Sequence, residues 1–449
     1  MNTIKAIQGN AFYSTDFNTV KHIHNGIFCF NEMGIITQVL EEHTQGYKDI
    51  KKTVSNIRVL HKDQIILPGF VDLHIHAPQW PQAGIALDRP LEVWLNEYTF
   101  PLEAKFKDLE FAKKVYTDVV NATLKHGTTT AVYFATVDRK SSTLLANICG
   151  EIGQRGFVGK VAMDDEIGCP SYYKDADAKE AVLETEKFIK DVLHLQKEYK
   201  QKVFPVITPR FIPSCSTECL IELGKLAQKY DVHIQTHASE SDWAHQFSKD
   251  KYGITDLAAL HQFGLITKKS IIAHAPFLEK SDLEILKDTQ CTIAHSPISN
   301  AFFANAVLPV KEFKSMGARI GLATDISGGF SPSMYQAIRQ AVISSRMLES
   351  GVNPSLAAHK RGQDNSAITF NNALYLATVA GGEALDLPVG KLEAGYFMDI
   401  QIITLDDNIP NYMKSMHKED VLHRILLLSE SSNISEVWIQ GNKVKGIQK

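Results

Sequence analysis

The chain has 449 residues, of which 44% are hydrophobic and 22% are charged, and its formal net charge is −4. This composition is ordinary for a folded globular protein, and the slight negative charge argues against nucleic-acid binding through clustered lysines and arginines. The N-terminal residues lack the apolar core of a signal peptide, and no run of about 18 uninterrupted apolar residues occurs. We therefore expect a cytoplasmic protein that binds neither nucleic acid nor a membrane.

Short β-like runs, separated by turn residues, occupy both ends of the chain. Residues 26–30 near the N-terminus and residues 399–404 near the C-terminus are examples, and neither region has a strong helical period. We expect residues 1–66 and 388–449 to form one small β-sandwich domain together.

The N-terminal region contains a histidine pair, His22 and His24, separated by one residue and followed by Asn25-Gly26. An Asn-Gly pair is typical of a hairpin turn, so we expect a turn there. No acidic residue or Pro-Gly accompanies the histidines, and we interpret them as a solvated pair.

Residues 67–387 alternate short apolar runs with helix-like segments, such as residues 108–126 and 220–230. This alternation is typical of repeated βα units around a parallel sheet, and eight units close a (β/α)8 barrel. We therefore predict an α/β protein with a TIM-like catalytic barrel. Residues 350–368 are polar and carry Gly and Pro, so we expect a loop or insertion there. The eight runs are residues 69–76, 128–136, 156–164, 202–211, 231–240, 270–275, 291–297 and 319–325.

Six cysteines are scattered along the chain without the density of a disulfide scaffold. We expect reduced thiols. Cys215 and Cys219 lie four residues apart at a predicted helix start, but a cysteine pair without further ligands is a weak indication of a metal site.

A second histidine pair, His74 and His76, ends the first predicted barrel strand. Successive side chains of a strand alternate between its faces, so both imidazoles point the same way. Imidazole is the commonest protein ligand for a zinc-like cation. The pair alone is also compatible with polar residues at a strand end.

Other strand ends carry ligand-type residues as well. His237, His274, His295 and Asp325 end four later runs, and the carboxyl ends of barrel strands meet at the active site. Three histidines and one carboxylate leave a coordination position for water, as a catalytic zinc site requires. We predict His74, His76, His237 and Asp325 as the metal ligands.

The remaining strand-end groups have less definite roles. His274 is either a fifth ligand or a catalytic residue that hydrogen-bonds the water or the substrate. His295 either orients a ligand or is structural. Glu240 follows His237 by three residues, where a carboxylate can take a proton from a metal-activated water and deliver it to the substrate. Asp325 could assist in deprotonating the water.

Several residues near these strand ends suit a flat heterocycle that bears a carbonyl. The Gln79 amide both donates and accepts hydrogen bonds, and Arg210 offers a cationic fork beside the aromatic Phe211. The expected substrate contacts are Gln79, Trp80, Arg210, Phe211 and His237.

Together these residues resemble the amidohydrolase superfamily, and within it the guanine deaminase branch. The resemblance covers nearly the whole chain, and the segments HAPQW, YTFP, TPRF and TDISGG are specific to this branch. The matching segments include PGFVDLHIHAPQW (68–80), EVWLNEYTFPLEAKF (92–106), HGTTTAVYFAT (126–136), ITPRF (207–211), HIQTHASE (233–240) and GLATDISGGFSPSM (321–334).

The resemblance implies a metal-dependent aminohydrolase that converts guanine to xanthine and ammonia. It places one zinc per subunit on the four predicted ligands, with iron as an alternative, and assigns the proton transfers to Glu240. It further implies a homodimer. The fourth run lacks the terminal lysine of two-metal relatives, so we expect one metal. Phe302 and Phe303 stand where smaller residues are usual, which leaves the exact substrate open.

Two alternatives remain at this point. One is an aminohydrolase of the same fold that acts on another ring, such as an oxidised guanine, a pterin or a triazine. The other is a non-catalytic assembly protein that kept the barrel, and such a protein would lose metal ligands.

Overall fold

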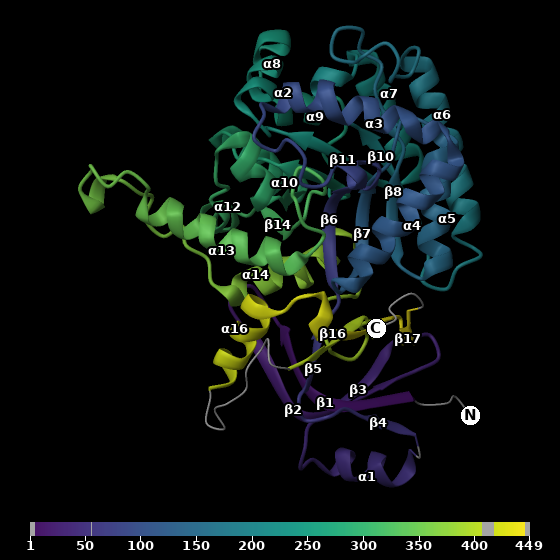
Figure 1. Ribbon diagram of the computed structural model, residues 1–449, viewed down its shortest axis with the longest axis vertical. Coiled ribbons are helices and arrows are strands. Elements are labelled where there is room, and N and C mark those ends of the chain that lie inside the picture. The colour runs from purple at the N-terminus through teal and green to yellow at the C-terminus, as the bar shows by residue number, and fades with distance from the viewer. Residues whose placement is uncertain (1–4, 55, 406–416, 445–449) are drawn as a thin grey trace.

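The computed structural model describes residues 5–54, 56–405 and 417–444, and Figure 1 shows a barrel above a smaller sheet. Within these residues, eight parallel strands form the barrel in the hydrogen-bonded order β14, β13, β12, β11, β10, β8, β7, β6, with a short ninth strand beside β10. Each predicted run overlaps one of the eight strands, so the predicted (β/α)8 barrel is confirmed. The strands are β6 (Phe70–His76), β7 (Thr128–Phe134), β8 (Arg155–Gly159), β9 (Val161–Ala162), β10 (Phe204–Pro209), β11 (His233–Ala238), β12 (Ser270–His274), β13 (Thr292–His295) and β14 (Arg319–Leu322).

Helices follow the barrel strands and surround them (Figure 1). Asp108 caps α4 by accepting hydrogen bonds from two backbone N–H groups of the first turn, and Ser216 caps α7, which begins three residues earlier than predicted. The longer helices are α4 (Leu109–Lys125), α5 (Arg139–Ile152), α6 (Ala178–Leu195), α7 (Thr217–Tyr230), α8 (Asp242–Tyr252), α9 (Asp256–Gln262), α10 (Lys280–Thr289), α13 (Met334–Ser350), α14 (Phe370–Ala377) and α16 (Lys418–Leu428).

Shorter helices fill the connections. The predicted loop at residues 350–368 is confirmed: it lies between α13 and α14 and projects to the left in Figure 1. Helix α1 (Gln45–Thr53) lies between β3 and β4 in the chain, and the shorter helices are α2 (Leu91–Trp94), α3 (Phe100–Glu103), α11 (Pro297–Ser299), α12 (Val310–Ser315) and α15 (Val379–Ala384).

Hydrogen bonds between β6 and the turn after β14 connect the first barrel strand to the last. The Asp325 N–H donates to the His74 carbonyl at 2.9 Å, and the His76 N–H donates to the Ile326 carbonyl at 2.6 Å. The buried carboxylate of Asp72 also accepts the Thr324 N–H at 3.0 Å. The chain segments that carry His74, His76 and Asp325 are thus joined directly.

A register shift in β6 orients His74 and His76. The pairing of β6 with β7 shifts between Asp72 and Ile75, so that two residues of β6, Leu73 and His74, oppose one of β7. Val71 and Leu73 belong to a buried apolar cluster of barrel side chains, and the ring centroids of His74 and His76 lie 4.8 Å apart. Bulges of this kind redirect side chains beside active sites.

The two ends of the chain form one sheet, in the order β17, β16, β15, β5, β1, β2, β3, with β4 beside β1. The predicted small β domain from both ends is therefore confirmed, whereas its boundaries at residues 66 and 388 stay a prediction. Buried Arg155 of the barrel pairs with buried Asp399 of the sheet region. The sheet strands are β1 (Lys5–Ser14), β2 (Val20–Phe30), β3 (Ile36–Leu40), β4 (Ile57–Val59), β5 (Gln64–Pro68), β15 (Ile400–Thr404), β16 (Ile434–Ile439) and β17 (Asn442–Lys443).

The predicted turn at Asn25-Gly26 is wrong, because β2 runs through both residues. Asn25 has the left-handed φ of 48° that an Asn-Gly turn would use, but it lies opposite a register shift between Gly9 and Ala11. The unusual backbone therefore makes a bulge within a long hairpin rather than its end.

The histidine pair in β2 differs from the pair in β6. His24 is exposed, as predicted, but His22 is half-buried against its cross-strand partner Phe12, with ring centroids 4.6 Å apart. The prediction of a solvated pair is therefore wrong for His22. Burial, with the nearby charges of Lys418 and His24, lowers the pKa of His22 to about 4.

This shift predicts that acid destabilises the small sheet through His22. Below a pH of about 6.5, His22 binds a proton in the unfolded chain but stays neutral in the folded protein. The free energy of unfolding therefore falls as the pH decreases from about 6.5 to 4. After allowance for solvent screening, we expect a contribution of about 1 kcal/mol. His22→Gln should remove that part of the pH dependence in urea unfolding, and His24→Gln should not. An equal slope in the wild type and both variants would contradict the assignment.

All six cysteines are buried and free, so the prediction of reduced thiols is confirmed. Cys215 and Cys219 come within 4.8 Å of Asp164. Both Asp164 oxygens, however, accept hydrogen bonds from Ser216, one from its backbone N–H at 2.7 Å and one from its hydroxyl at 2.5 Å. This group therefore holds the start of α7.

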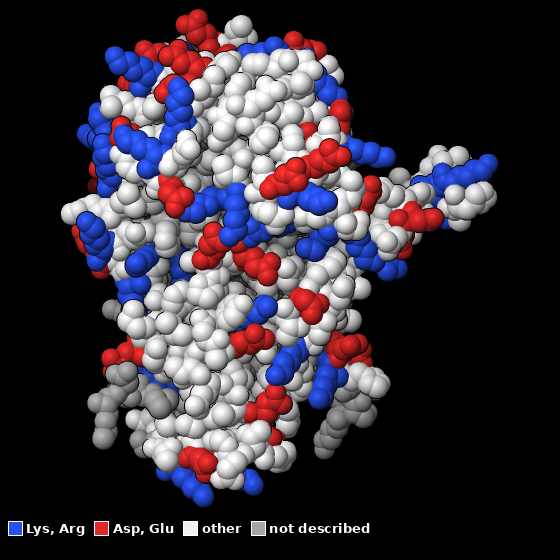
Figure 2. All heavy atoms as spheres, turned by 180° about the vertical axis from the view of Figure 1, so that it is seen from behind, with Lys and Arg blue, Asp and Glu red and all other residues white. Residues whose placement is uncertain are grey.

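No helix among residues 5–54, 56–405 and 417–444 is long and apolar enough to cross a membrane. Figure 2 shows one face of the molecule, on which basic and acidic side chains are interspersed. That face carries no extended patch of a single charge, in agreement with the composition.

Candidate active site

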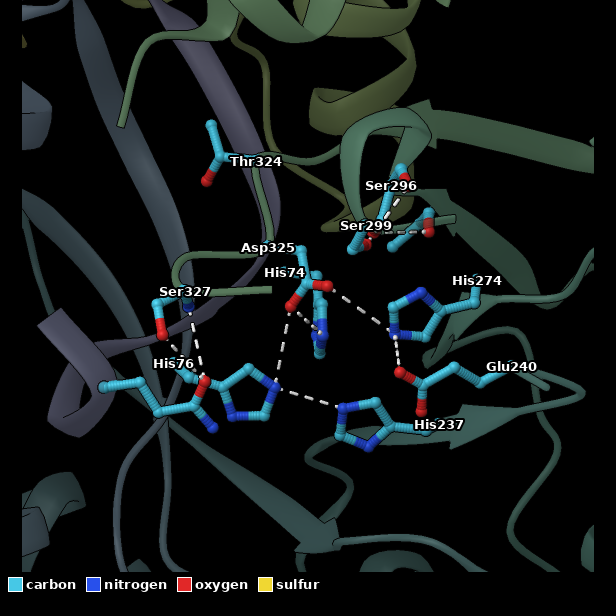
Figure 3. Close-up of polar contacts among 12 residues, drawn as sticks. His74, His76, His237, Glu240, His274, Ser296, Ser299, Thr324, Asp325 and Ser327 are labelled. Atoms are coloured by element: carbon cyan, nitrogen blue, oxygen red, sulfur yellow. Dashed lines mark hydrogen bonds and ion pairs between the residues drawn. The ribbon is translucent and has the colours of Figure 1, made fainter. Parts of the chain in front are cut away.

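Six ligand-type side chains converge at the carboxyl ends of the barrel strands, and Figure 3 shows them pointing toward one another. They come from β6, β11, β12 and the turns after β11 and β14, so residues up to 251 positions apart in the sequence meet in one place. All six are buried. They are His74, His76, His237, Glu240, His274 and Asp325.

The predicted metal ligands lie within contact distance. The Nε2 atoms of His76 and His237 are 3.1 Å apart, and Asp325 Oδ1 lies 3.1 Å from His74 Nε2 and 3.7 Å from His76 Nε2. Among the described residues, His74, His76 and Asp325 form one candidate cation cluster. His74 and His237 belong to a second, overlapping cluster with His274.

The protonation of these imidazoles fits a cation. Burial, followed by neighbouring basic groups, lowers the pKa of His74, His76 and His237 well below its usual value, so the rings are neutral. His237 Nδ1 lies 2.6 Å from the Arg210 carbonyl and must donate its proton there, which leaves a lone pair on Nε2. His74 Nε2 is buried without a hydrogen-bond partner in the described structure. Lone pairs at such close range, beside a carboxylate, are the donor set of a zinc-like ion.

His274 lies at the edge of this cluster. Its Nδ1 is 3.0 Å from Asn300 Oδ1, so it donates to that amide oxygen and directs an Nε2 lone pair inward. That Nε2 lies 3.5 Å from Glu240 Oε1 and 3.8 Å from Asp325 Oδ2. The geometry allows both predicted roles, a further ligand or a hydrogen-bond partner of water. Asn300, which sets this orientation, was not predicted from the sequence.

The two carboxyl groups are electrostatically coupled. Burial, together with the charge of Asp325, raises the pKa of Glu240 to about 8. Burial also raises the pKa of Asp325, while His274 opposes the rise. A carboxyl group with a pKa near neutrality can both accept and release a proton, as a general acid/base requires.

A cavity opens beside these groups, and in it a few polar side chains converge among apolar and aromatic ones, as is usual for a small-molecule site. The predicted contacts Gln79, Arg210, Phe211 and His237 line it. Phe303, which the sequence singled out, lines it too, whereas sequence reasoning missed the apolar wall formed by Leu91, Trp94 and Leu95 in the segment after β6. The lining residues are His76, Gln79, Leu91, Trp94, Leu95, Arg210, Phe211, His237, Glu240, Phe303, Asp325 and Gly328.

Trp80, a predicted substrate contact, does not line the cavity and instead packs against the main hydrophobic core. Gln79 and Trp80 are neighbours in the 3₁₀ helix Ala77–Gln82, in which successive side chains point about 120° apart. The side chain of Trp80 therefore points away from the cavity that Gln79 lines. Trp94 provides an aromatic wall instead, with its ring centroid 5.1 Å from that of Phe303.

His295 is buried on β13, and its Nδ1 has no hydrogen-bond partner among the described residues. Burial and the charge of His274 lower its pKa to about 3. The imidazole is thus neutral, and both roles considered for it stay open.

The model of the amidohydrolase family matches residues 65–444. This range covers most of the chain and contains every residue of the site. The chain belongs to the amidohydrolase family. Within it, the curated relatives place the chain in the guanine deaminase branch, a group of hydrolytic enzymes.

Two of these curated relatives are guanine deaminases of Homo sapiens and Dictyostelium discoideum. The human enzyme is 36% identical over 94% of this chain and 96% of its own length, and the Dictyostelium enzyme is 32% identical over 98% of both. A crystal structure of guanine deaminase from C. acetobutylicum with bound guanine in the active site is 30% identical. Its TM-score is 0.87, and the match covers 98% of this chain and 100% of that one. The two proteins therefore share one fold over nearly the whole of both chains.

Proposed function

We propose that this amidohydrolase converts guanine and water to xanthine and ammonia. The observation that carries the proposal is the cavity itself, in which the amide of Gln79 and the guanidinium of Arg210 lie beside the histidine and aspartate cluster. The relatives named guanine deaminase, and the related structure with bound guanine, support the same substrate.

The cluster would hold one zinc per subunit on His74, His76, His237 and Asp325, with Fe²⁺ as an alternative. When bound, such a metal lowers the pKa of a bound water to about 7, so that the water can act as a nucleophile at neutral pH. The chain supplies the remaining requirements. Its neutral imidazoles offer nitrogen lone pairs, and the buried carboxylate of Asp325 offers negative charge to a divalent cation.

Glu240 carries the protons. It accepts a proton from water as the water oxygen bonds to C2 of guanine, and it passes that proton to the ring nitrogen beside C2. It then delivers the second proton of the water to the amino group, so that the C2–N bond breaks and ammonia leaves. His274 Nε2, 3.5 Å from Glu240 Oε1, can hold the reacting oxygen in place by hydrogen bonding.

The cavity walls orient the base. Arg210 would donate to O6 of guanine, and the Gln79 amide would pair with a neighbouring polar edge of the ring. Phe211, which lines the same cavity, offers an aromatic face to the flat base. A homodimer and a cytoplasmic location stay predictions.

Ammonia release from guanine, compared with release from adenine, cytosine, a pterin, a triazine and an oxidised guanine, tests the proposal. We expect guanine to give the highest kcat/KM. Inactivity on guanine with turnover of another ring would overturn the substrate assignment. A preparation that binds no metal and turns over none of them would favour the non-catalytic alternative.

The apolar lining of the cavity predicts a second kinetic effect. Phe303→Ala removes an aromatic ring that packs on Trp94 above the base, so the KM for guanine should rise about tenfold with a smaller change in kcat. Phe302 is the matched control, because it is 42% exposed and does not line the cavity. Equal kinetics for Phe303→Ala and Phe302→Ala would remove Phe303 from the substrate contacts.

A further inference from the structure

Glu103 is a buried carboxylate that no strand-end pattern predicts. It ends the short helix α3 in the segment between β6 and α4, and it is 1% exposed. Its two oxygens accept four hydrogen bonds. The donors are Gln79 Nε2 at 2.9 Å, Arg210 Nη2 at 3.2 Å, Arg210 Nη1 at 2.7 Å and the Tyr173 hydroxyl at 2.7 Å.

The charge of Glu103 determines which way the Gln79 amide faces. A carboxylate can only accept hydrogen bonds, so the NH₂ group of Gln79 must point at Glu103. The amide oxygen is then directed the other way, where the Ser327 N–H lies 3.3 Å from it. An amide that is free to flip would offer a substrate donor and acceptor groups at random.

Glu103 holds the guanidinium of Arg210 in the same way. Two nitrogens of the fork donate to its two oxygens, and the Phe100 ring lies 5.0 Å from Arg210 Cζ. Burial alone would lower the pKa of Arg210, but the charge of Glu103 outweighs it and raises that pKa. Nη1 also donates to Met163 Sδ at 4.0 Å, so the remaining N–H bonds of Nη2 and Nε are the ones available to a ligand in the cavity that Arg210 lines.

Tyr173 fixes the position of the Glu103 carboxylate by a hydrogen bond. The Tyr173 hydroxyl oxygen accepts the Val137 N–H at 3.3 Å, so its hydrogen is directed at Glu103. All four donors around the carboxylate therefore have assigned directions, and two of the three donor side chains line the candidate substrate cavity. A carboxylate that served only to neutralise a buried arginine would have no need to bond the glutamine as well.

We propose that Glu103 is a positioning residue for base recognition: it orients Gln79 and Arg210 together and thereby makes the site prefer a purine that bears a 6-oxo group. This inference deepens the proposed function and rests on it. Glu103 acts through its two partners, and all of its carboxylate oxygens are already occupied by protein donors, so it makes no contact with the base itself.

Binding of two unreactive bases to the metal-loaded protein tests the proposal. Hypoxanthine carries the 6-oxo group and purine lacks it, and neither has a 2-amino group to lose. We expect the wild type to bind hypoxanthine more tightly than purine in calorimetry. Glu103→Gln should weaken hypoxanthine by roughly tenfold or more and purine by at most about twofold, because a misplaced polar contact affects only the ligand that uses it. Equal weakening of both bases, or of neither, would overturn it.

Two further variants keep the test decisive. Glu97→Gln makes the same change at an exposed position of the same segment and should alter neither affinity. Tyr173→Phe keeps the charge of Glu103 and removes one of its donors, so the preference for hypoxanthine should fall about threefold. If Glu103→Gln does not fold, an unchanged preference in Tyr173→Phe overturns the proposal.

The binding preference for hypoxanthine and the turnover of guanine test different proposals. A wild type that prefers hypoxanthine but releases no ammonia from guanine would contradict the proposed function and leave the role of Glu103 intact. A wild type that binds both bases equally would contradict the role of Glu103, whatever its activity on guanine.

Discussion

Glu240→Gln should abolish turnover while leaving the metal and the base bound. The two side chains have nearly the same shape, but an amide cannot take a proton from water and return it to the substrate. Burial and Asp325 raise the pKa of Glu240 to about 8, so the native carboxyl exchanges a proton readily near neutral pH. General acid/base groups contribute roughly 10²–10⁴-fold, and two transfers through one residue place the expected loss of kcat at about 10³-fold or more. Ammonia release, elemental analysis and hypoxanthine titration measure the three quantities.

The same substitution at Glu284, an exposed residue of α10, serves as the control and should change none of them. Near-normal kcat in Glu240→Gln would show that another group moves the protons, with Asp325 as the next candidate. Loss of metal together with activity would instead make Glu240 part of the metal site.

The residues of the site that lie near the ends of barrel strands could be predicted from the sequence. His74, His76, His237, His274 and Asp325 all stand at or directly after the carboxyl end of a barrel strand, and closure of the barrel brings those ends together whatever the loops do. Periodicity and position were therefore sufficient for these residues. The register shift in β6 lies outside that reasoning, because a bulge depends on pairing with β7.

The walls of the cavity were not predictable in the same way. Glu103, Leu91 and Trp94 belong to the segment between β6 and α4, whose path is set by packing over the barrel mouth. No local pattern says which of its side chains turn inward. Trp80 illustrates the difficulty, since one step along a 3₁₀ turn separates a cavity residue from a core residue.

The small sheet shows a related limit. Its strands were recognisable from short apolar runs. The two ends of the chain were expected to form one domain because both alternate such runs with turn residues. Asn25-Gly26 misled the turn assignment because a left-handed residue serves a bulge as well as a hairpin end. Only the pairing partner, β1, distinguishes the two.

Asp325→Ala should remove the metal and, with it, all measurable activity. In the native protein Asp325 Oδ1 lies 3.1 Å from His74 Nε2 and supplies the negative charge of the donor set. Substitution of residues that merely orient metal ligands lowers metal affinity by about 10–100-fold, so removal of a charged ligand should lower it by at least about 100-fold. Elemental analysis after dialysis measures the occupancy directly.

Thermal unfolding gives an independent measure of the same loss. A ligand that binds only the folded state stabilises it in proportion to its affinity, so a chelator should lower the Tm of the wild type and leave the Tm of Asp325→Ala unchanged. Asp288→Ala, on the exposed face of α10, should behave as the wild type does. If Asp325→Ala retains full metal and responds to the chelator, the histidines alone hold the ion. His274 would then take the place of Asp325 in the cluster, because one of its ring nitrogens lies within 4.8 Å of ligand atoms of both His74 and His237.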